Sequence, residues 1–278
     1  MTRLIIFTTV VLSFSLLRTN STHAAMLYVS SNFLGDNQLS TLDTDTLTTT
    51  PVGTFGTVQN TGLSDWNGRL FGFDQTADLV FELDPATAAI IDTFDVGLPN
   101  LGGEGSIAFR ADGTGFLTEG GDTARLHTFD IGAGTSSFVS NDIASLGGID
   151  GADFFADTLY GLSQGTSSDL YTIDTATGAT TLVGLSNINT GFLAGLTFDS
   201  NGALFAITFG GDLYSVNPLN GAASLLGNTG LTAVSGLTAL DALQPEPVPE
   251  PASIALLGIG AIGMCGGLRL RKRNKGRG

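Results

Sequence analysis

One unit recurs five times along this chain, and it restricts the fold more than any other feature. The copies align on the acid or amide that ends a short alternating strand: Asp43, Asp84, Asp130, Asp174 and Asn217. The successive spacings are 41, 46, 44 and 43 residues. A repeat of about 40 to 45 residues that contains only strand patterns is typical of the blades of a β-propeller.

Turn residues occur at two places in the unit and predict two β-hairpins, hence four strands per unit. The turn after the aligned acid or amide ends in glycine at Gly178 and Gly221, where the chain needs a positive φ. An earlier hairpin turns at Asn67-Gly68, Asp112-Gly113 and Asn201-Gly202, each between apolar runs. Such dipeptides are strong signals for tight β-hairpins.

The two ends of the array predict a closed ring. The segment 27–31 matches the second strand of a unit but has no first strand before it, and the segment 235–241 matches a first strand with nothing after it. Pairing of these segments would complete one blade and leave only short edges exposed. We therefore predict an all-β fold, a five-bladed β-propeller closed by N- and C-terminal strand pairing. Six blades are the alternative if one unit is degenerate, while an open β-solenoid or sandwich leaves the half-units unexplained.

The predicted propeller domain, residues 26–243, is strongly acidic. Between residues 25 and 248 there are 25 acids and only three basic residues, Arg69, Arg110 and Arg125, which gives a net charge of −22. Such a charge repels nucleic acid and favours solubility and cation binding, so we exclude nucleic-acid partners. The only cysteine, Cys265, lies outside the domain, which excludes a disulfide or thiolate site within it.

Residues 1–25 have the pattern of a secretory signal peptide. Arg3 precedes an apolar run from residue 4 to 17, small residues follow, and we expect cleavage at Ala24 and Ala25. The alternative is a membrane anchor, which is disfavoured because the run is short and stops at Arg18.

The C-terminal end has two parts. Residues 244–251 form a predicted linker, in which four prolines hold the chain extended. In the tail, residues 252–278, an apolar run from residue 254 to 268 predicts a short transmembrane helix. A basic cluster follows and would hold this helix at the cytoplasmic side. The cluster contains Arg269, Arg271, Lys272, Arg273, Lys275 and Arg277.

This tail resembles a PEP-CTERM sorting signal. The resemblance covers roughly the last thirty residues and depends on Val248, Pro249, Glu250 and Pro251, then the glycine-bearing apolar run and the arginine-rich end. It implies an exported protein of a Gram-negative bacterium, held transiently in the inner membrane and processed by an exosortase, a membrane protease. It further implies delivery to the cell surface or the exopolysaccharide matrix. It implies nothing about the ligand of the propeller.

Few residues of the domain suggest catalysis or metal binding. The aligned acids are expected to cap their turns by accepting backbone N–H bonds. Calcium is the one cofactor left open, with Asp150, Asp153 and the segment 120–122 as the places for it. His127 occupies a position that holds Ser40, Phe81, Tyr171 and Tyr214 in the other copies, so we expect it to pack rather than to catalyse.

Two further patterns in the chain resemble those of enzymes. Glycoside hydrolysis needs paired carboxylates projecting into the channel, and Glu82, Glu104 and Glu119 are candidates by residue type alone. The glycine pattern at 258–263 matches a dinucleotide-binding fingerprint but lacks the strand before it and the acid after it. We therefore expect a non-catalytic exported propeller that serves as a binding or structural scaffold of the cell surface or exopolysaccharide matrix, with extracellular polysaccharide or surface proteins as candidate partners. The alternative is a glycosidase or a calcium-dependent lactone or ester hydrolase.

Overall fold

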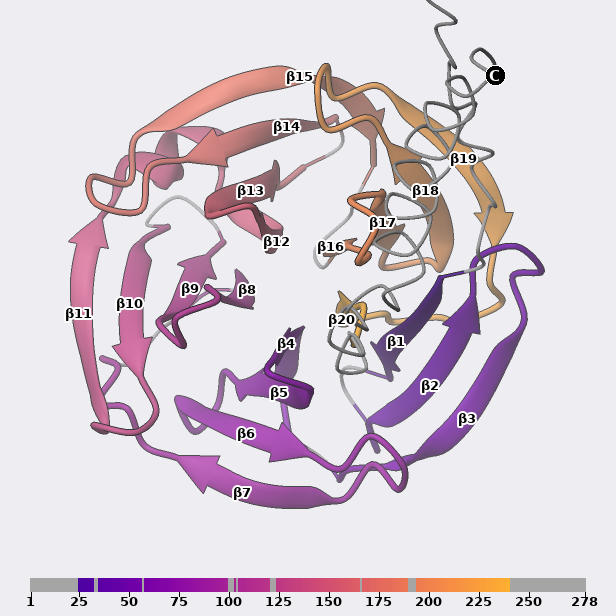
Figure 1. Cartoon of the computed structure of the whole chain (residues 1–278), viewed down its shortest axis with the longest axis horizontal. Coiled ribbons are helices and arrows are strands. Elements are labelled where there is room, and N and C mark those ends of the chain that lie inside the picture. Colours follow the sequence, from indigo (N-terminus) through magenta and orange to yellow (C-terminus); the bar gives the residue numbers. More distant parts are fainter. Residues whose placement is uncertain are drawn as a thin grey trace, which may run out of the picture.

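The protein folds into a ring of five four-stranded antiparallel sheets around a central channel (Figure 1). The structure, a computed structural model, describes residues 25–32, 35–56, 58–99, 103, 105–120, 124–165, 167–189 and 194–240. These five blades confirm the predicted all-β, five-bladed propeller. The signal peptide, the linker and the sorting tail, with its predicted transmembrane helix, lie outside the described residues.

We number the blades along the chain and give each from its inner strand outward. Blade 1 contains β20 (Gly236–Thr238), β1 (Met26–Ser31), β2 (Gln38–Asp43) and β3 (Thr49–Thr54). Blade 2 contains β4 (Asn60–Trp66), β5 (Arg69–Asp74), β6 (Leu79–Leu83) and β7 (Ile90–Phe94). Blade 3 contains β8 (Gly105–Phe109), β9 (Gly115–Glu119), β10 (Leu126–Asp130) and β11 (Thr135–Ser140).

The remaining two blades follow the same order. Blade 4 contains β12 (Ile149–Phe155), β13 (Thr158–Ser163), β14 (Ser168–Ile173) and β15 (Thr180–Ile188). Blade 5 contains β16 (Ala194–Phe198), β17 (Leu204–Thr208), β18 (Asp212–Val216) and β19 (Ala223–Asn228). A short 3₁₀ helix, η1 (Asp142–Leu146), joins blades 3 and 4.

Blade 1 is built from both ends of the described chain. The inner strand β20 pairs with β1 in antiparallel register, with Val29 opposite Leu237 and Tyr28 opposite Thr238. At the start of β20, the hydroxyl groups of Ser30 and Ser235 lie 3.0 Å apart. Asn60 of the neighbouring blade donates to Ser30 at 2.8 Å, so this buried polar cluster connects blades 1 and 2.

The inner strands lie close together because each has a small residue where it meets the next blade. A Cβ atom on Gly236 would lie 2.5 Å from the backbone nitrogen of Leu63, and one on Gly195 would lie 2.4 Å from the Cβ atom of Leu237. Both distances are too short for real side chains, so only glycine fits there. In register with the second strands, four equivalent residues are Ser106, Gly151, Gly195 and Gly236. Gly62 lies in the bulge of β4 and is also close to Ile107 of the next blade.

Hydrogen bonds also cross every blade junction around the channel. In four of them, a side-chain oxygen on one inner strand accepts a backbone N–H of the next blade, and at the fifth Thr238 donates to Asp65. These bonds are Phe109 N to Ser64 Oγ (3.2 Å), Ala152 N to Ser106 Oγ (3.1 Å), Phe198 N to Asp153 Oδ2 (2.7 Å), Ala239 N to Thr197 Oγ1 (3.0 Å) and Thr238 Oγ1 to Asp65 Oδ1 (3.2 Å).

The hydrophobic core is divided among clusters of buried side chains, several of which span neighbouring blades. One cluster joins blades 2 and 3 through Phe71, Phe109 and Phe129, and another joins blades 5 and 1 through Phe205 and Leu237. Each fully buried large side chain contributes about 1.5–3 kcal/mol through the hydrophobic effect. This distributed core holds a disulfide-free ring together.

The aligned acids cap their turns, as predicted. Asp130 Oδ1 accepts the N–H groups of Gly132 and Ala133 at 2.7 and 2.9 Å, and Asp174 makes the same pair of bonds at 2.9 and 3.0 Å. Backbone donors of this kind hold the pKa of Asp174 below its usual value. Asn217 accepts the N–H of Leu219 at 2.9 Å without a charge, so an amide suffices for this turn.

Candidate ligand-binding face

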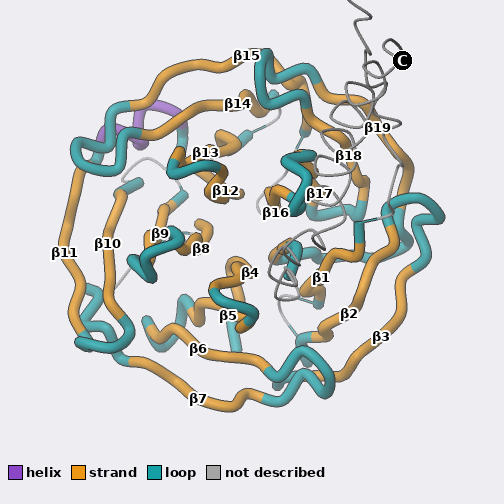
Figure 2. Tube along the Cα trace, in the orientation of Figure 1, coloured by secondary structure: helices purple, strands orange, loops and turns teal. Residues whose placement is uncertain are grey.

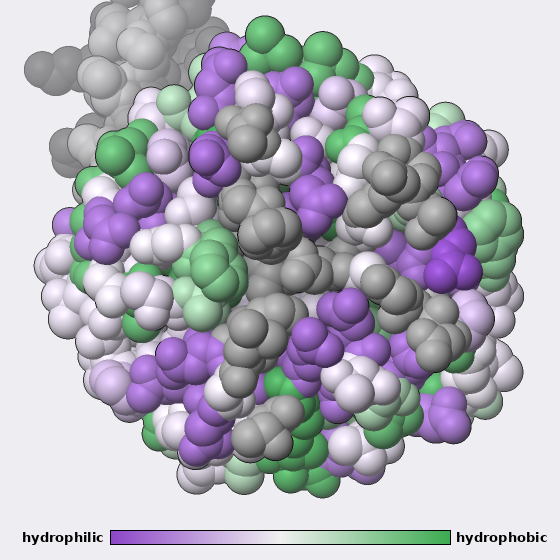
Figure 3. All heavy atoms as spheres, turned by 180° about the vertical axis from the view of Figure 1, so that it is seen from behind, coloured by the Kyte–Doolittle hydropathy of each residue, from purple (hydrophilic) through white to green (hydrophobic). Residues whose placement is uncertain are grey.

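Among the residues that the structure describes, two hollows open on the face of the ring that carries the hairpins between the inner and second strands. In Figure 2 these hairpins turn toward the viewer around the channel. We call this side the hairpin face. The first hollow, the channel mouth, has a volume of about 360 Å³, and the second, the groove between blades 2 and 3, about 320 Å³. Trp66 lines both hollows. On the opposite face, hydrophilic and hydrophobic side chains are interspersed in small groups (Figure 3).

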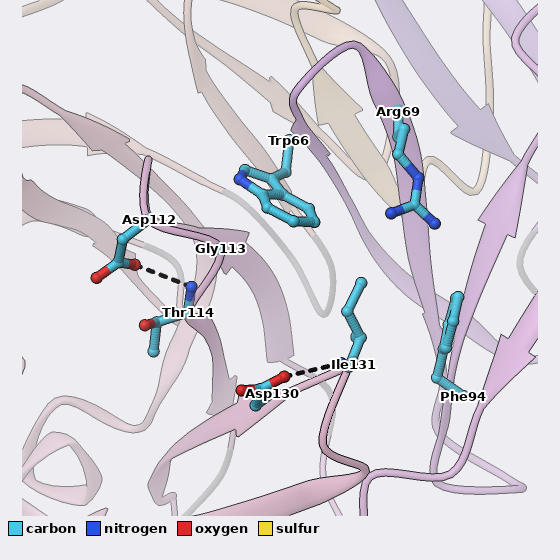
Figure 4. A pocket seen from close by; sticks show the side chains of 9 residues that line it. Trp66, Arg69, Phe94, Asp112, Gly113, Thr114, Asp130 and Ile131 are labelled. Atoms are coloured by element: carbon cyan, nitrogen blue, oxygen red, sulfur yellow. Dashed lines mark hydrogen bonds between the residues drawn. The ribbon is translucent and has the colours of Figure 1, made fainter.

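Three turns and one strand end bring the groove residues together (Figure 4). The β4–β5 hairpin contributes Trp66 and Arg69, on either side of a tight turn in which Asn67 and Gly68 have φ of 53° and 74°. Positive φ at both positions matches the type I′ hairpin turn that the Asn-Gly pair favours. The remaining lining residues come from the β8–β9 hairpin, the β10–β11 turn and the end of β7: Asp112, Gly113, Thr114, Asp130, Ile131, Gly132 and Phe94.

The indole of Trp66 is fixed on several sides. It stacks on Phe109 with ring centres 5.9 Å apart and ring planes 16° apart, and its Nε1 donates to the carbonyl of Ala111 at 3.4 Å. Gly113 lies against the indole so closely that a Cβ atom there would come within 2.6 Å of it. The wall of the groove is therefore held in one position before any ligand arrives.

Charged groups lie on opposite sides of the groove. Arg69 makes a two-pronged ion pair with Glu82, with 2.9 Å from Nε to Oε1, and its guanidinium lies 4.9 Å from the centre of the Phe71 ring. Asp112 accepts the N–H of Thr114 at 2.9 Å and pairs with Arg110 at 2.7 Å. The hydrogen bonds from Arg110 and then from Thr114 hold the pKa of Asp112 well below its usual range, so it stays ionised.

The channel mouth is acidic. Asp65, Asp153, Asp157 and Asp199 line it with several aromatic rings, and none of the described lining residues is basic. Asp153 accepts bonds from Phe198 N at 2.7 Å and Thr197 Oγ1 at 3.1 Å. Desolvation of the Asp153 carboxyl outweighs these bonds and, together with the nearby charge of Asp65, raises its pKa to about 7.

The structure does not bring the predicted hydrolase acids into a facing pair. Glu82 is held by Arg69, and the buried Glu119 is held by Arg125, with 2.6 Å from Nε to Oε2. Each of these carboxylates is therefore paired with an arginine rather than with another acid. Glu104 lies outside the described residues.

The candidate metal ligands are also separate. Asp150 is fully buried on β12, Asp153 faces the channel mouth, and Asp122 lies outside the described residues. Within the part of the chain that the structure describes, no three His, Cys, Asp or Glu side chains gather closely enough to hold a metal ion.

His127 packs inside blade 3, as the repeat alignment predicted. Its ring is buried and lies edge-on to Phe138, with ring centres 5.7 Å apart. Burial, and to a smaller extent the charge of Arg125, lower the pKa of His127 to about 4. The imidazole is therefore neutral at physiological pH.

The groove is not evident in the sequence, because its residues lie in two different repeats. One signal was present: the only tryptophan in the chain stands three residues before one of the three arginines of the domain. No alignment within a single repeat would place Asp112 and Asp130 beside them.

Several predicted sites fall outside the described residues. They are Ala24 of the signal cleavage site and all of the sorting-signal residues, Val248, Pro249, Glu250, Pro251, Arg269, Arg271, Lys272 and Arg273. Among the residues that are described, no helix is long and apolar enough to cross a membrane.

The fold and the open hairpin face define a five-bladed β-propeller with preformed surface hollows. The chain also carries the PEP-CTERM protein-sorting motif over residues 247–273, which confirms the predicted sorting tail. The motif implies an exported protein that is anchored transiently in a membrane and recognised by an exosortase.

Known structures support the fold alone. A chain of the nidogen/laminin complex is similar with a TM-score of 0.54 and 16% identity, covering 77% of this chain and 81% of that one. A gluconolactonase from Xanthomonas campestris is similar with a TM-score of 0.50 and 14% identity, covering 77% of this chain and 79% of that one. No curated protein is detectably similar in sequence.

Proposed function

We propose that this protein is a non-catalytic binding scaffold delivered to the cell surface or exopolysaccharide matrix of a Gram-negative bacterium. The observation that carries the proposal is the PEP-CTERM motif at residues 247–273, directly after the propeller. In this scheme the signal peptide starts export, the tail holds the protein in the inner membrane, and an exosortase then processes it. The propeller remains outside the cell, where its hairpin face recognises a ligand.

The chemistry of the described residues supports binding rather than catalysis. Arg69 and Arg125 neutralise the carboxylates of Glu82 and Glu119, and His127 is buried and neutral. The two hollows of the hairpin face instead offer rigid concave surfaces that combine aromatic and charged groups, as small-ligand sites do. Hydrolysis of a lactone or glycoside by the purified protein would contradict this part of the proposal.

Two finer features belong to the same scheme. The apolar run from residue 254 to 268 forms the transient membrane helix, and the basic residues after it hold its end in the cytoplasm. The pairing of β20 with β1 is what keeps the ring closed outside the cell, where the domain has no disulfide to do so.

A change of Glu250 to alanine is expected to block processing, so that the protein accumulates in the inner membrane and delivery falls at least tenfold. The chain contains a matched control, because Pro-Glu-Pro occurs twice, at 245–247 and at 249–251, and only the second copy lies wholly within the matched motif. Glu246→Ala removes the same charge just outside it and should leave delivery unchanged. Cell fractionation with an antibody against the propeller measures both variants, together with a chain that ends at residue 248.

Equal delivery of all of these chains would refute the role of the tail. Recovery of the wild-type protein from the cytosol with both ends intact would refute export itself.

A further inference from the structure

The groove between blades 2 and 3 combines three kinds of surface that a sugar ring requires. A pyranose has apolar C–H faces and an edge of hydroxyl groups that both donate and accept hydrogen bonds. We propose that this groove binds one neutral sugar residue of a polysaccharide, an inference that rests on the proposed function as an exported binding scaffold.

Carboxylate acceptors occupy one side of the groove. Asp130 Oδ1 is held by two backbone N–H groups of its own turn, which fixes the side chain. Its second oxygen, Oδ2, makes no hydrogen bond with the residues that the structure describes. Asp130 lines the groove together with Asp112. Hydroxyl groups donate well to such fixed carboxylates, because a charged acceptor makes a hydrogen bond stronger than a neutral one does.

A guanidinium donor lies across the groove. Glu82 accepts hydrogen bonds from Nε and Nη2 of Arg69, which orients the guanidinium. The third nitrogen, Nη1, makes no hydrogen bond with the described residues and is a donor for a ligand oxygen. Trp66, Phe94 and Ile131 supply the apolar part of the lining (Figure 4). Donors, acceptors and an aromatic wall are thus held in fixed positions around a volume of about 320 Å³.

The charge around the groove disfavours anionic ligands. Glu82 pairs with Arg69, while two aspartates, Asp112 and Asp130, line the groove in a domain of net charge −22. This field repels uronic acids, sulfated sugars and other anionic glycans. A neutral sugar meets no such repulsion.

The chain provides its own reporter for this site, because Trp66 is its only tryptophan and lines the groove. Titration of the purified protein with cellohexaose, isomaltohexaose, mannohexaose and an alginate hexamer, followed by tryptophan fluorescence, tests the proposal. We expect a saturable change with at least one neutral oligosaccharide and none with alginate.

The discriminating variant is Asp130→Asn. An amide keeps the turn, as Asn217 shows in blade 5, but it places an N–H₂ donor where the groove has a carboxylate acceptor. We expect affinity to fall about tenfold, the effect of losing one hydrogen bond to a charged group. The matched control is Asp174→Asn, the same change in the equivalent turn of blade 4, which does not line the groove and should alter affinity less than twofold.

Four outcomes overturn the proposal: no fluorescence change with any neutral oligosaccharide, a response to alginate alone, binding that leaves Trp66 fluorescence unchanged, or equal affinity of the two variants. Each of them leaves the delivery experiment with Glu250→Ala unaffected, so failure of the sugar site is distinguishable from failure of the exported-scaffold function.

Discussion

The change Leu237→Ala is expected to lower the free energy of unfolding by about 3 kcal/mol, because it creates a cavity at the junction of blades 5 and 1. Leu237 is 1% exposed and packs with Leu27, Val29 and Phe205. A Cβ atom on Gly195 of the neighbouring inner strand would lie only 2.4 Å from the Cβ atom of Leu237, so the two strands are tightly packed here. Urea unfolding followed by fluorescence measures this loss.

Leu225 provides the control for a general sensitivity to leucine removal. It lies on the outer strand β19 and is 58% exposed, so Leu225→Ala should change stability by less than about 0.5 kcal/mol. If the two variants unfold at the same urea concentration, β20 contributes nothing to the stability of the ring.

The change Asp153→Asn is expected to stabilise the protein at pH 8 and to have little effect at pH 4. In the folded state the pKa of Asp153 is raised to about 7 from its ordinary 3.8, so folding favours the protonated form. Between these two values the unfolded chain is ionised while the folded one is not, and stability falls as the pH rises. The difference between the folded and unfolded pKa values of Asp153 corresponds to a loss of about 4 kcal/mol of stability, an upper limit because water reaches the channel mouth.

The cause of this pH dependence is local. Desolvation comes first, and Asp65 on β4, the inner strand of blade 2, adds a like charge. Asp157 and Asp199 also line the channel mouth, with no basic side chain among the described lining residues. Asp157→Asn is the control, since it removes a charge from the same hollow in a turn whose φ of 63° suits asparagine. The free energy of unfolding is measured by urea titration at several pH values from 4 to 8.5. Its decrease with rising pH should become smaller for Asp153→Asn alone. An unchanged decrease in that variant would contradict the burial of this carboxyl.

The architecture could be predicted because each repeat has the same type of capping residue at the same position. An acid or amide at the end of the third strand must cap the next turn, and Asp43, Asp84, Asp130, Asp174 and Asn217 all do so. The expectation that glycine supplies the positive φ of these turns holds for only three of the five blades. The turns of blades 1 and 2 place Leu47 and Ala88 at φ of 57° and 62°, where the other three have Gly134, Gly178 and Gly221. Packing of these two side chains against the core offsets the backbone strain.

The candidate site was harder to predict, because its residues are assembled across blade junctions. Alignment within a repeat finds what the units share, whereas the groove depends on what blades 2 and 3 do differently. The acids Glu82 and Glu119 show the same limit. By residue type they resembled catalytic groups, and only the fold shows that each one faces an arginine, Arg69 and Arg125.

The construction of blade 1 limits how far the hairpin face can lie from an anchoring membrane. Because β20 lies inside that blade and ends at Thr238, the last described residues lie on the hairpin face, where Ala239 lines the channel mouth. Eleven residues, 241–251, separate them from the sorting tail, and such a length of chain spans at most about 40 Å. In the proposed scheme an anchored tail therefore keeps the ligand-binding side within that reach of the bilayer, and release of the tail removes the restraint.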